Sequence, residues 1–245
     1  MRRSASGGAG AIFFISLCAV LTVLFLSLSA WQVQRRAWKL DLIASVERRI
    51  HAAPVPAPGP AAWPGISGQA DAYRRVALTG VYDHARETLV QAVTEKGAGF
   101  WVMTPLRVDQ GFTVLVNRGF VPGDLSLAST RAAGQVKGPV SVIGLLRLSE
   151  PHGGFLRANR PGEGRWYSRD VQAIATAKSL SEVAPYFVDA DGAPNPGGWP
   201  LGGLTVVRFP NSHLVYALTW FGLALLTGGA GVYVWREARR ETRRA

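Results

Sequence analysis

Two long stretches without any charged side chain lie near the two ends of the chain. They are Ser4–Gln34 and Phe209–Trp235, with the one histidine in the second counted as neutral. Each is longer than the roughly 20 apolar residues that a helix needs to span a hydrocarbon core about 30 Å thick. Because a helix satisfies its own backbone hydrogen bonds in lipid, the pattern predicts transmembrane helices over residues 11–33 and 210–235.

A cleavable signal peptide is the alternative for the first stretch, which follows two arginines and has small residues near its end. Its apolar run, Ala9–Ala30, is longer than the 7–15 residues of a usual signal core. Trp31 then occupies the position of an interfacial aromatic residue, and Arg35 and Arg36 follow. We therefore favour a retained anchor over cleavage.

After the first stretch the pattern changes to an amphipathic helix and then to a linker. Apolar residues recur at spacings of three and four over Leu40–Ile50, so the first helix is predicted to continue to about His51. The Pro-, Ala- and Gly-rich residues 54–64 predict a stiff linker. We assign residues 34–72 to this helical extension and linker.

Residues 73–209 have the alternating apolar and polar positions of a β-rich domain, beginning with Val76, Leu78 and Gly80. Further strands are predicted at Thr88–Val93, Phe100–Arg107, Thr113–Asn117, Val140–Leu148, Pro185–Val188 and Leu204–Phe209. One short helix is predicted at Asp170–Leu180. Strands outnumber helices and no βαβ alternation appears, so we expect a mostly antiparallel sheet or a partly open barrel. The fold class is therefore membrane α+β, with two transmembrane helices that flank an extracytoplasmic β domain.

Short basic tails predict the orientation. Residues 236–245 hold five arginines against two glutamates, and residues 1–10 hold two more arginines. Because short basic tails stay in the cytoplasm, both termini are expected there and the β domain outside. The first apolar stretch begins within about ten residues of Met1, which leaves no room for a mitochondrial transit peptide. We therefore expect a bacterial inner membrane protein with a periplasmic domain.

The net charge of +11 does not indicate nucleic acid as a partner. The two tails supply nearly half of this charge, where it would face anionic lipid, and no basic and aromatic cluster is present. The single cysteine, Cys18, lies in the first apolar stretch, so the outer domain has neither a disulfide nor a CxxC site. Thiol–disulfide exchange is thereby excluded as an activity.

Patterns of known catalytic sites are scarce. The sequence has no G-x-S-x-G, no H-E-x-x-H and no phosphate-binding P-loop. Its four histidines, His51, His84, His152 and His213, are far apart, and no pair has the close spacing of metal ligands.

His213 is the histidine of most interest, because it lies at the predicted outer mouth of the second helix. A neutral imidazole there could ligate haem iron, and an apolar helix could shelter the macrocycle. The alternative is an interfacial residue that hydrogen-bonds to lipid headgroups or caps the helix together with Asn211. From position alone we favour the interfacial residue.

Arg118 is a second candidate, in a strand end that turns at a Gly/Pro pair and includes Asn117 and Gly119. It could bind an anionic ligand such as a haem propionate, or equally pair with a nearby carboxylate or carbonyl. Gly80 is expected at a strand bulge or a close backbone approach.

The second apolar stretch also contains residues suited to helix contacts. Trp220 is expected to pack against lipid or against the first helix, and Tyr216 lies one turn before it. Four glycines would permit two helices to approach closely, at Gly222, Gly228, Gly229 and Gly231. Pairing of the two helices within the chain is favoured over docking on a larger membrane complex.

Together these motifs resemble the surfeit locus protein 1 family, from about Trp31 to Trp235. The early matches are Trp31-Gln32 with Arg35 and Lys39, Leu78-Thr79-Gly80 with Tyr82-Asp83, Thr104-Pro105-Leu106, and Val114-Leu115-Val116-Asn117-Arg118-Gly119-Phe120-Val121-Pro122. The later matches are Gly144-Leu145-Leu146-Arg147, Arg165-Trp166-Tyr167 with Asp170, Gly202-Gly203-Leu204, Asn211-Ser212-His213-Leu214, and Tyr216-Ala217-Leu218-Thr219-Trp220-Phe221-Gly222-Leu223.

The resemblance implies an assembly factor, or chaperone, of cytochrome c oxidase that helps to place haem a in subunit I. Its partners would be subunit I, other oxidase assembly factors and membrane lipid. The resemblance also implies that His213 is a ligand of transiently bound haem a, and that the protein is not an enzyme. Ser212 departs from the family pattern, in which many bacterial members have a second Asn.

Two other functions stay open at this point. A haem-independent membrane scaffold would bind nascent oxidase subunits without touching haem. A membrane-anchored periplasmic hydrolase would need a nucleophile with a base nearby, and no known pattern of that kind is present.

Overall fold

The computed structural model describes residues 5–154, 156–207 and 209–244. The chain divides into two compact units, each described here by itself. The first, residues 1–44 and 208–245, contains helix α4 (His213–Arg244) and most of helix α1 (Ala5–His51). The second, residues 45–207, contains the sheet.

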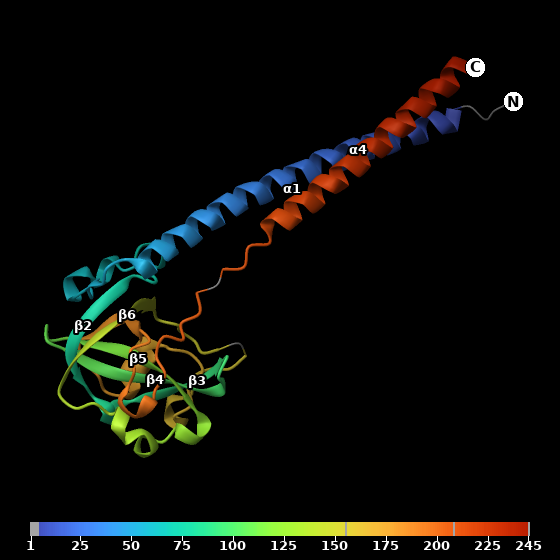
Figure 1. Ribbon diagram of the computed structural model, residues 1–245. Coiled ribbons are helices and arrows are strands. Elements are labelled where there is room, and N and C mark those ends of the chain that lie inside the picture. Colours follow the sequence, from blue (N-terminus) through green and yellow to red (C-terminus); the bar gives the residue numbers. More distant parts are fainter. Residues whose placement is uncertain (1–4, 155, 208, 245) are drawn as a thin grey trace. The chain divides into compact units, whose positions relative to one another are not determined.

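The two long helices pack side by side in antiparallel directions (Figure 1). Their contacts pair early residues of α1 with late residues of α4. Gly231 lies against Cys18, and the hydroxyls of Thr22 and Thr227 are 2.9 Å apart. The predicted pairing of the helices within the chain is therefore confirmed.

Both helices are long and apolar enough to cross a membrane, over Ala9–His51 and His213–Arg243. Many of their large apolar side chains are exposed, and Ile12, Phe13 and Leu226 are each exposed by more than 65%. An apolar outer surface of this kind is typical of helices that face lipid.

The second unit is built on seven strands: β1 (Val55–Pro56), β2 (Arg75–Tyr82), β3 (Thr88–Thr94), β4 (Gly97–Val108), β5 (Thr113–Pro122), β6 (Pro139–Leu148) and β7 (Val183–Ala190). Their order is β1-β2-β6-β7-β5-β4-β3, and β2 also pairs with β4. That extra pairing closes β2, β6, β7, β5 and β4 into a barrel. Most pairs are antiparallel, as predicted, but β5–β7 and the short β1–β2 pair are parallel.

The closure between β2 and β4 is short and begins at Gly80, which is opposite Val108. A Cβ on Gly80 would lie 2.2 Å from the carbonyl oxygen of Arg107. The two backbones can approach this closely because Gly80 has no side chain.

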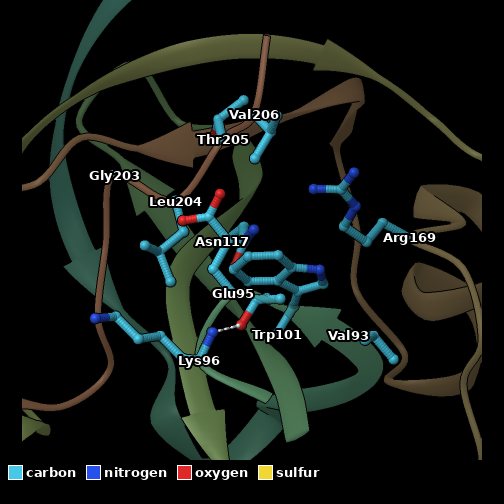
Figure 2. A pocket seen from close by; sticks show the side chains of 11 residues that line it. Val93, Glu95, Lys96, Trp101, Asn117, Arg169, Gly203, Leu204, Thr205 and Val206 are labelled. Carbon is cyan, nitrogen blue, oxygen red and sulfur yellow. Dashed lines mark hydrogen bonds between the residues drawn. The ribbon is translucent and has the colours of Figure 1, made fainter. Parts of the chain in front are cut away.

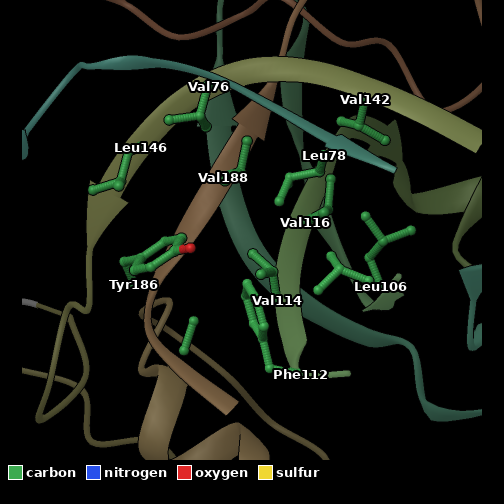
Figure 3. Packing of buried hydrophobic residues seen from close by; sticks show 12 residues of the cluster. Val76, Leu78, Leu106, Phe112, Val114, Val116, Val142, Leu146, Tyr186 and Val188 are labelled. Atoms are coloured by element: carbon green, nitrogen blue, oxygen red, sulfur yellow. The ribbon is translucent and has the colours of Figure 1, made fainter. Parts of the chain in front are cut away.

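The main hydrophobic core fills the barrel (Figure 3). Along β5, Val114 and Val116 face this core, whereas Leu115 faces a second cluster that includes Ile174 of helix α3 (Val171–Ala177). This alternation has the period of two that a strand imposes. The predicted helix is thus confirmed in a shorter form, and Asp170 caps it by accepting a hydrogen bond from the backbone of Ala173.

The Pro-rich residues 54–64, expected to be a stiff linker, pack against the barrel core instead. The indole of Trp63 donates a 3.0 Å hydrogen bond to the carbonyl of Pro58 and meets the ring of Phe112 edge-on. The hydroxyl of Tyr186 donates to the same carbonyl at 2.7 Å. The carbonyl of Pro58 therefore ties this segment to the barrel core through two aromatic side chains.

The predicted strand Leu204–Phe209 was wrong for the residues that the structure describes, which are 204–207 and 209; Arg208 lies outside them. The described residues of this segment do not pair with any strand of the sheet. Thr205 is instead held by its hydroxyl, which donates to the carboxylate of Asp189 at 3.1 Å. Side-chain contacts rather than strand pairing therefore hold this segment.

Short helical turns complete the second unit. They are α2 (Gly68–Asp71) and the 3₁₀ turns Pro60–Gly65, His84–Arg86, Gly123–Leu125, Ala128–Gly134, Pro161–Glu163 and Pro196–Gly198.

Candidate functional site

His213 is the first residue of α4, and its imidazole reaches across to α1. Nδ1 of His213 lies 2.7 Å from the side-chain oxygen of Gln32. Gln32 is only 9% exposed, whereas His213 is partly open to the outside. The pair links the two helices where α4 begins.

Neighbouring side chains hold the two helices together next to this pair. The hydroxyl of Ser29 donates to the carbonyl of Ala217 at 3.0 Å, and Trp220 stacks on Phe25 with ring centroids 5.6 Å apart. Of the two contacts predicted for Trp220, the one with the first helix is therefore present. Tyr216, by contrast, is 54% exposed.

The predicted helix cap by Asn211 is not formed by its side-chain oxygen. That oxygen is buried and has no hydrogen-bond partner among the residues that the structure describes. The first turn of α4 is closed by the backbone, since the amide of Tyr216 donates to the carbonyl of Ser212.

The donor set at His213 is one imidazole nitrogen, which fits the axial position of a haem iron. No cluster of three or more His, Cys, Asp or Glu side chains occurs among the described residues, so a metal held by protein ligands alone has no site there. A haem brings four ring nitrogens and needs only one or two protein ligands. Within the described part of the chain, Nε2 of His213 makes no hydrogen bond, so it is free to serve as one.

The structure places Arg118 in the other unit, at one end of the barrel interior. It is 2% exposed, and its Nη2 donates to the carbonyl of Gly134 and, at 3.1 Å, to the side-chain oxygen of Asn195. Its guanidinium carbon lies 4.9 Å from the ring centroid of Tyr82. Carbonyl partners were one of the two alternatives for Arg118. Its contact with a haem propionate stays a prediction.

Burial changes the ionisation of this pair. It lowers the pKa of Arg118 from its ordinary value, although the nearby Tyr82 and Glu87 act in the opposite direction. Burial also raises the pKa of Tyr82 to about 12, which the positive charge of Arg118 offsets only in part. Nε and Nη1 of Arg118 have no partner among the described residues. Arg118 is therefore a cation held mainly by dipoles of the domain itself.

Asn117, the residue before Arg118, faces the opposite side of β5 and joins a buried charge network. Its side-chain amide donates to Asp189 at 2.8 Å, and Asp189 also accepts from Arg147 at 2.8 Å and from Arg169 at 3.0 Å. Burial alone would lower the pKa of Arg169, but the carboxylates of Asp189 and Glu150 more than offset this and raise it.

The network borders a cavity of about 370 Å³ (Figure 2). Asn117, Trp101 and Arg169 line it together with Leu204 and Thr205 of the segment after β7. At the inner wall, Asn117 and Arg169 both donate hydrogen bonds to Asp189, so these polar groups already have partners within the domain. The rim of the cavity is open and has both polar and apolar side chains.

Two groups that the sequence reasoning had not singled out as site residues are Gln32 and Asp189. The sequence contained a clue to Gln32, because an amide inside a long uncharged stretch needs a hydrogen-bond partner when it is buried. Asp189 had no local signal, because its four partners come from two other strands and two loops.

The comparisons with known proteins identify the family. The SURF1 family model matches residues 19–225, which include Gln32, Arg118 and His213. The chain belongs to the SURF1 family. Surfeit locus protein 1 of Homo sapiens is 38% identical over 234 residues, covering 88% of this chain and 74% of the human protein. The SURF1-like protein of Monosiga brevicollis is 36% identical over 248 residues, covering 96% of this chain and 91% of that protein.

The matched residues therefore lie in both units and span the positions of Gln32 and His213. A more distant relative, the SURF1-like protein of Caenorhabditis elegans, is 28% identical over 232 residues and covers 86% of this chain and 70% of that protein.

Proposed function

We propose that this protein is an assembly factor of cytochrome c oxidase that holds haem a through His213 and hands it to subunit I. The observation that carries the proposal is the imidazole between the two helices, whose Nδ1 is engaged by Gln32 and whose Nε2 makes no hydrogen bond to any described residue. Membership of the SURF1 family supports the assembly role. In this proposal haem a is cargo, and no covalent step of the protein is required.

One protein ligand suits a carrier better than a closed site does. A haem held by one iron–nitrogen bond can be released when that bond breaks, whereas a second strong ligand would slow its transfer. The apolar outer surfaces of the two helices would lie against the macrocycle, and Trp220 stacked on Phe25 keeps that surface ordered.

The basic tails support an orientation with both termini in the cytoplasm of a bacterium and His213 at the outer face of the inner membrane. Subunit I, other oxidase assembly factors and lipid are the partners in this proposal. The β domain would contact protein partners, and its cavity beside Trp101 offers a surface for them.

Rescue of oxidase assembly tests the proposal. In a bacterial strain that lacks its own SURF1 family protein, the wild-type chain should restore the haem a content and activity of the oxidase in membranes. His213→Ala should restore at least about 10-fold less, because the loss of the metal ligand removes the iron contact.

The matched control for rescue is His51→Ala, which removes an exposed histidine that pairs with Glu47 one turn away. It should rescue like the wild type. Full rescue by His213→Ala would contradict haem handling at this residue and favour the haem-independent scaffold.

A further inference from the structure

Gln32 is a buried amide in a helix whose neighbouring positions face outward. Gln34, only two residues later, is exposed. A buried amide without a partner costs free energy, so its position has to be explained by what it contacts. Within the described part of the chain, the hydrogen-bond partner of the Gln32 side-chain oxygen is Nδ1 of His213, at 2.7 Å across the helix interface.

This contact determines where the imidazole carries its proton. A carbonyl oxygen can only accept a hydrogen bond, so Nδ1 must carry the hydrogen and donate it. In a neutral ring the lone pair then lies on Nε2, which is the nitrogen without a hydrogen bond among the described residues.

We infer that Gln32 is a positioning residue that fixes His213 in the Nδ1-protonated tautomer and so presents Nε2 as a metal ligand. The inference rests on the proposed function in one respect only, that the metal bound by Nε2 is the iron of haem. Histidines that bind metals generally donate their second ring nitrogen to an acceptor, which sets the tautomer and the ring orientation.

A neutral amide acceptor also suits a histidine that has to release the metal group it binds. A glutamate at this position would place a charge between two apolar helices, which is costly in lipid. It would also draw the Nδ1 proton more strongly and make Nε2 a stronger donor to iron. The neutral oxygen of Gln32 orients the ring without that increase in ligand strength.

The opposite amide orientation gives the opposite chemistry, which makes the inference testable. If the amide nitrogen of Gln32 faced Nδ1, it would donate to the ring, and Nε2 would then carry the proton and could not ligate iron.

Nitrogen NMR of the full-length, haem-free chain labelled with ¹⁵N-histidine distinguishes the two orientations. The spectrum would be recorded at about pH 8.5, where an ordinary histidine is neutral. The chain has four histidines, and His213 is assigned by the loss of its signals in His213→Ala. We expect a protonated Nδ1 and a bare Nε2 in the wild type. Gln32→Leu, which keeps the side-chain volume, should shift the ring toward the Nε2-protonated form.

Variants of the acceptor give the matched comparison. Gln32→Glu keeps an acceptor and should keep the wild-type tautomer, and Gln34→Leu should change nothing. A wild-type ring protonated on Nε2, or a tautomer that Gln32→Leu leaves unchanged, would overturn the inference.

Titration of the variants with haem then tests the positioning role of Gln32 separately from the proposed function. Gln32→Leu should weaken haem affinity roughly 10- to 100-fold relative to Gln34→Leu, and Gln32→Glu should lower the reduction potential of the bound iron. Equal haem affinity of Gln32→Leu and Gln34→Leu would overturn the positioning role. If no variant, including the wild type, binds haem while the NMR result is as expected, the proposed cargo is wrong and the tautomer assignment stands.

Discussion

Gly119→Ala is expected to destabilise the β domain by more than about 3 kcal/mol, a large part of the roughly 5–15 kcal/mol by which a folded domain is stable. Gly119 has a φ of +127°, and a Cβ there would lie 2.0 Å from the carbonyl oxygen of Leu201. Phe120 and Leu201 exchange two backbone hydrogen bonds of 2.9 Å beside it, so the neighbouring backbone cannot withdraw without breaking them. Thermal unfolding of the full chain in detergent, followed by tryptophan fluorescence, measures the effect.

Gly111→Ala is the matched control, because Gly111 also has a positive φ, of +91°, but no described heavy atom near its Cβ position within 4 Å. It should cost only about 1 kcal/mol, the strain of the backbone conformation alone. Equal losses in the two variants would mean that contact with Leu201 contributes nothing.

Asp189→Ala is the second change with a large expected effect, a loss of about 3–5 kcal/mol. Asp189 is 3% exposed, and its carboxylate accepts hydrogen bonds from Asn117, Arg147, Arg169 and Thr205. Removing it leaves two largely buried guanidinium groups without this shared counter-charge. Chemical unfolding of the full chain gives the free-energy difference.

Glu163→Ala is the control for the charge network. Glu163 also pairs with two arginines, at 3.5 Å to Arg160 and 3.2 Å to Arg165, but its side chain is 50% exposed. Exposed pairs of this kind contribute less than about 1 kcal/mol. A loss for Asp189→Ala no larger than that for Glu163→Ala would show that burial does not strengthen the network.

The spacing of apolar residues in the sequence correctly predicted helices and strands that have one apolar environment along their length. The two apolar stretches became the paired helices α1 and α4, and Val114 and Val116 alternate with Leu115 because strand β5 separates two cores. Each of these features depends on a few consecutive residues in one kind of surrounding, so a single sequence is enough to reveal it.

Contacts between distant residues could not be predicted in this way. The parallel pairing of β5 with β7 joins Val116 to Val188, and no local pattern distinguishes that partner from an antiparallel one. The bond between Gln32 and His213 spans 181 positions. Position alone favoured an interfacial role for His213, and only the buried amide opposite its ring reveals that Nδ1 is engaged and that Nε2 has no hydrogen-bond partner among the described residues.

An absorption spectrum tests the central claim most directly. The full-length protein would be purified after co-expression with the enzymes of haem a synthesis, beside His213→Ala prepared in the same way. We predict Soret and α bands of haem a in the wild type and their loss in the variant, while circular dichroism shows that the variant keeps its secondary structure. Two colourless proteins, or two that are equally coloured, would contradict the claim that His213 holds haem.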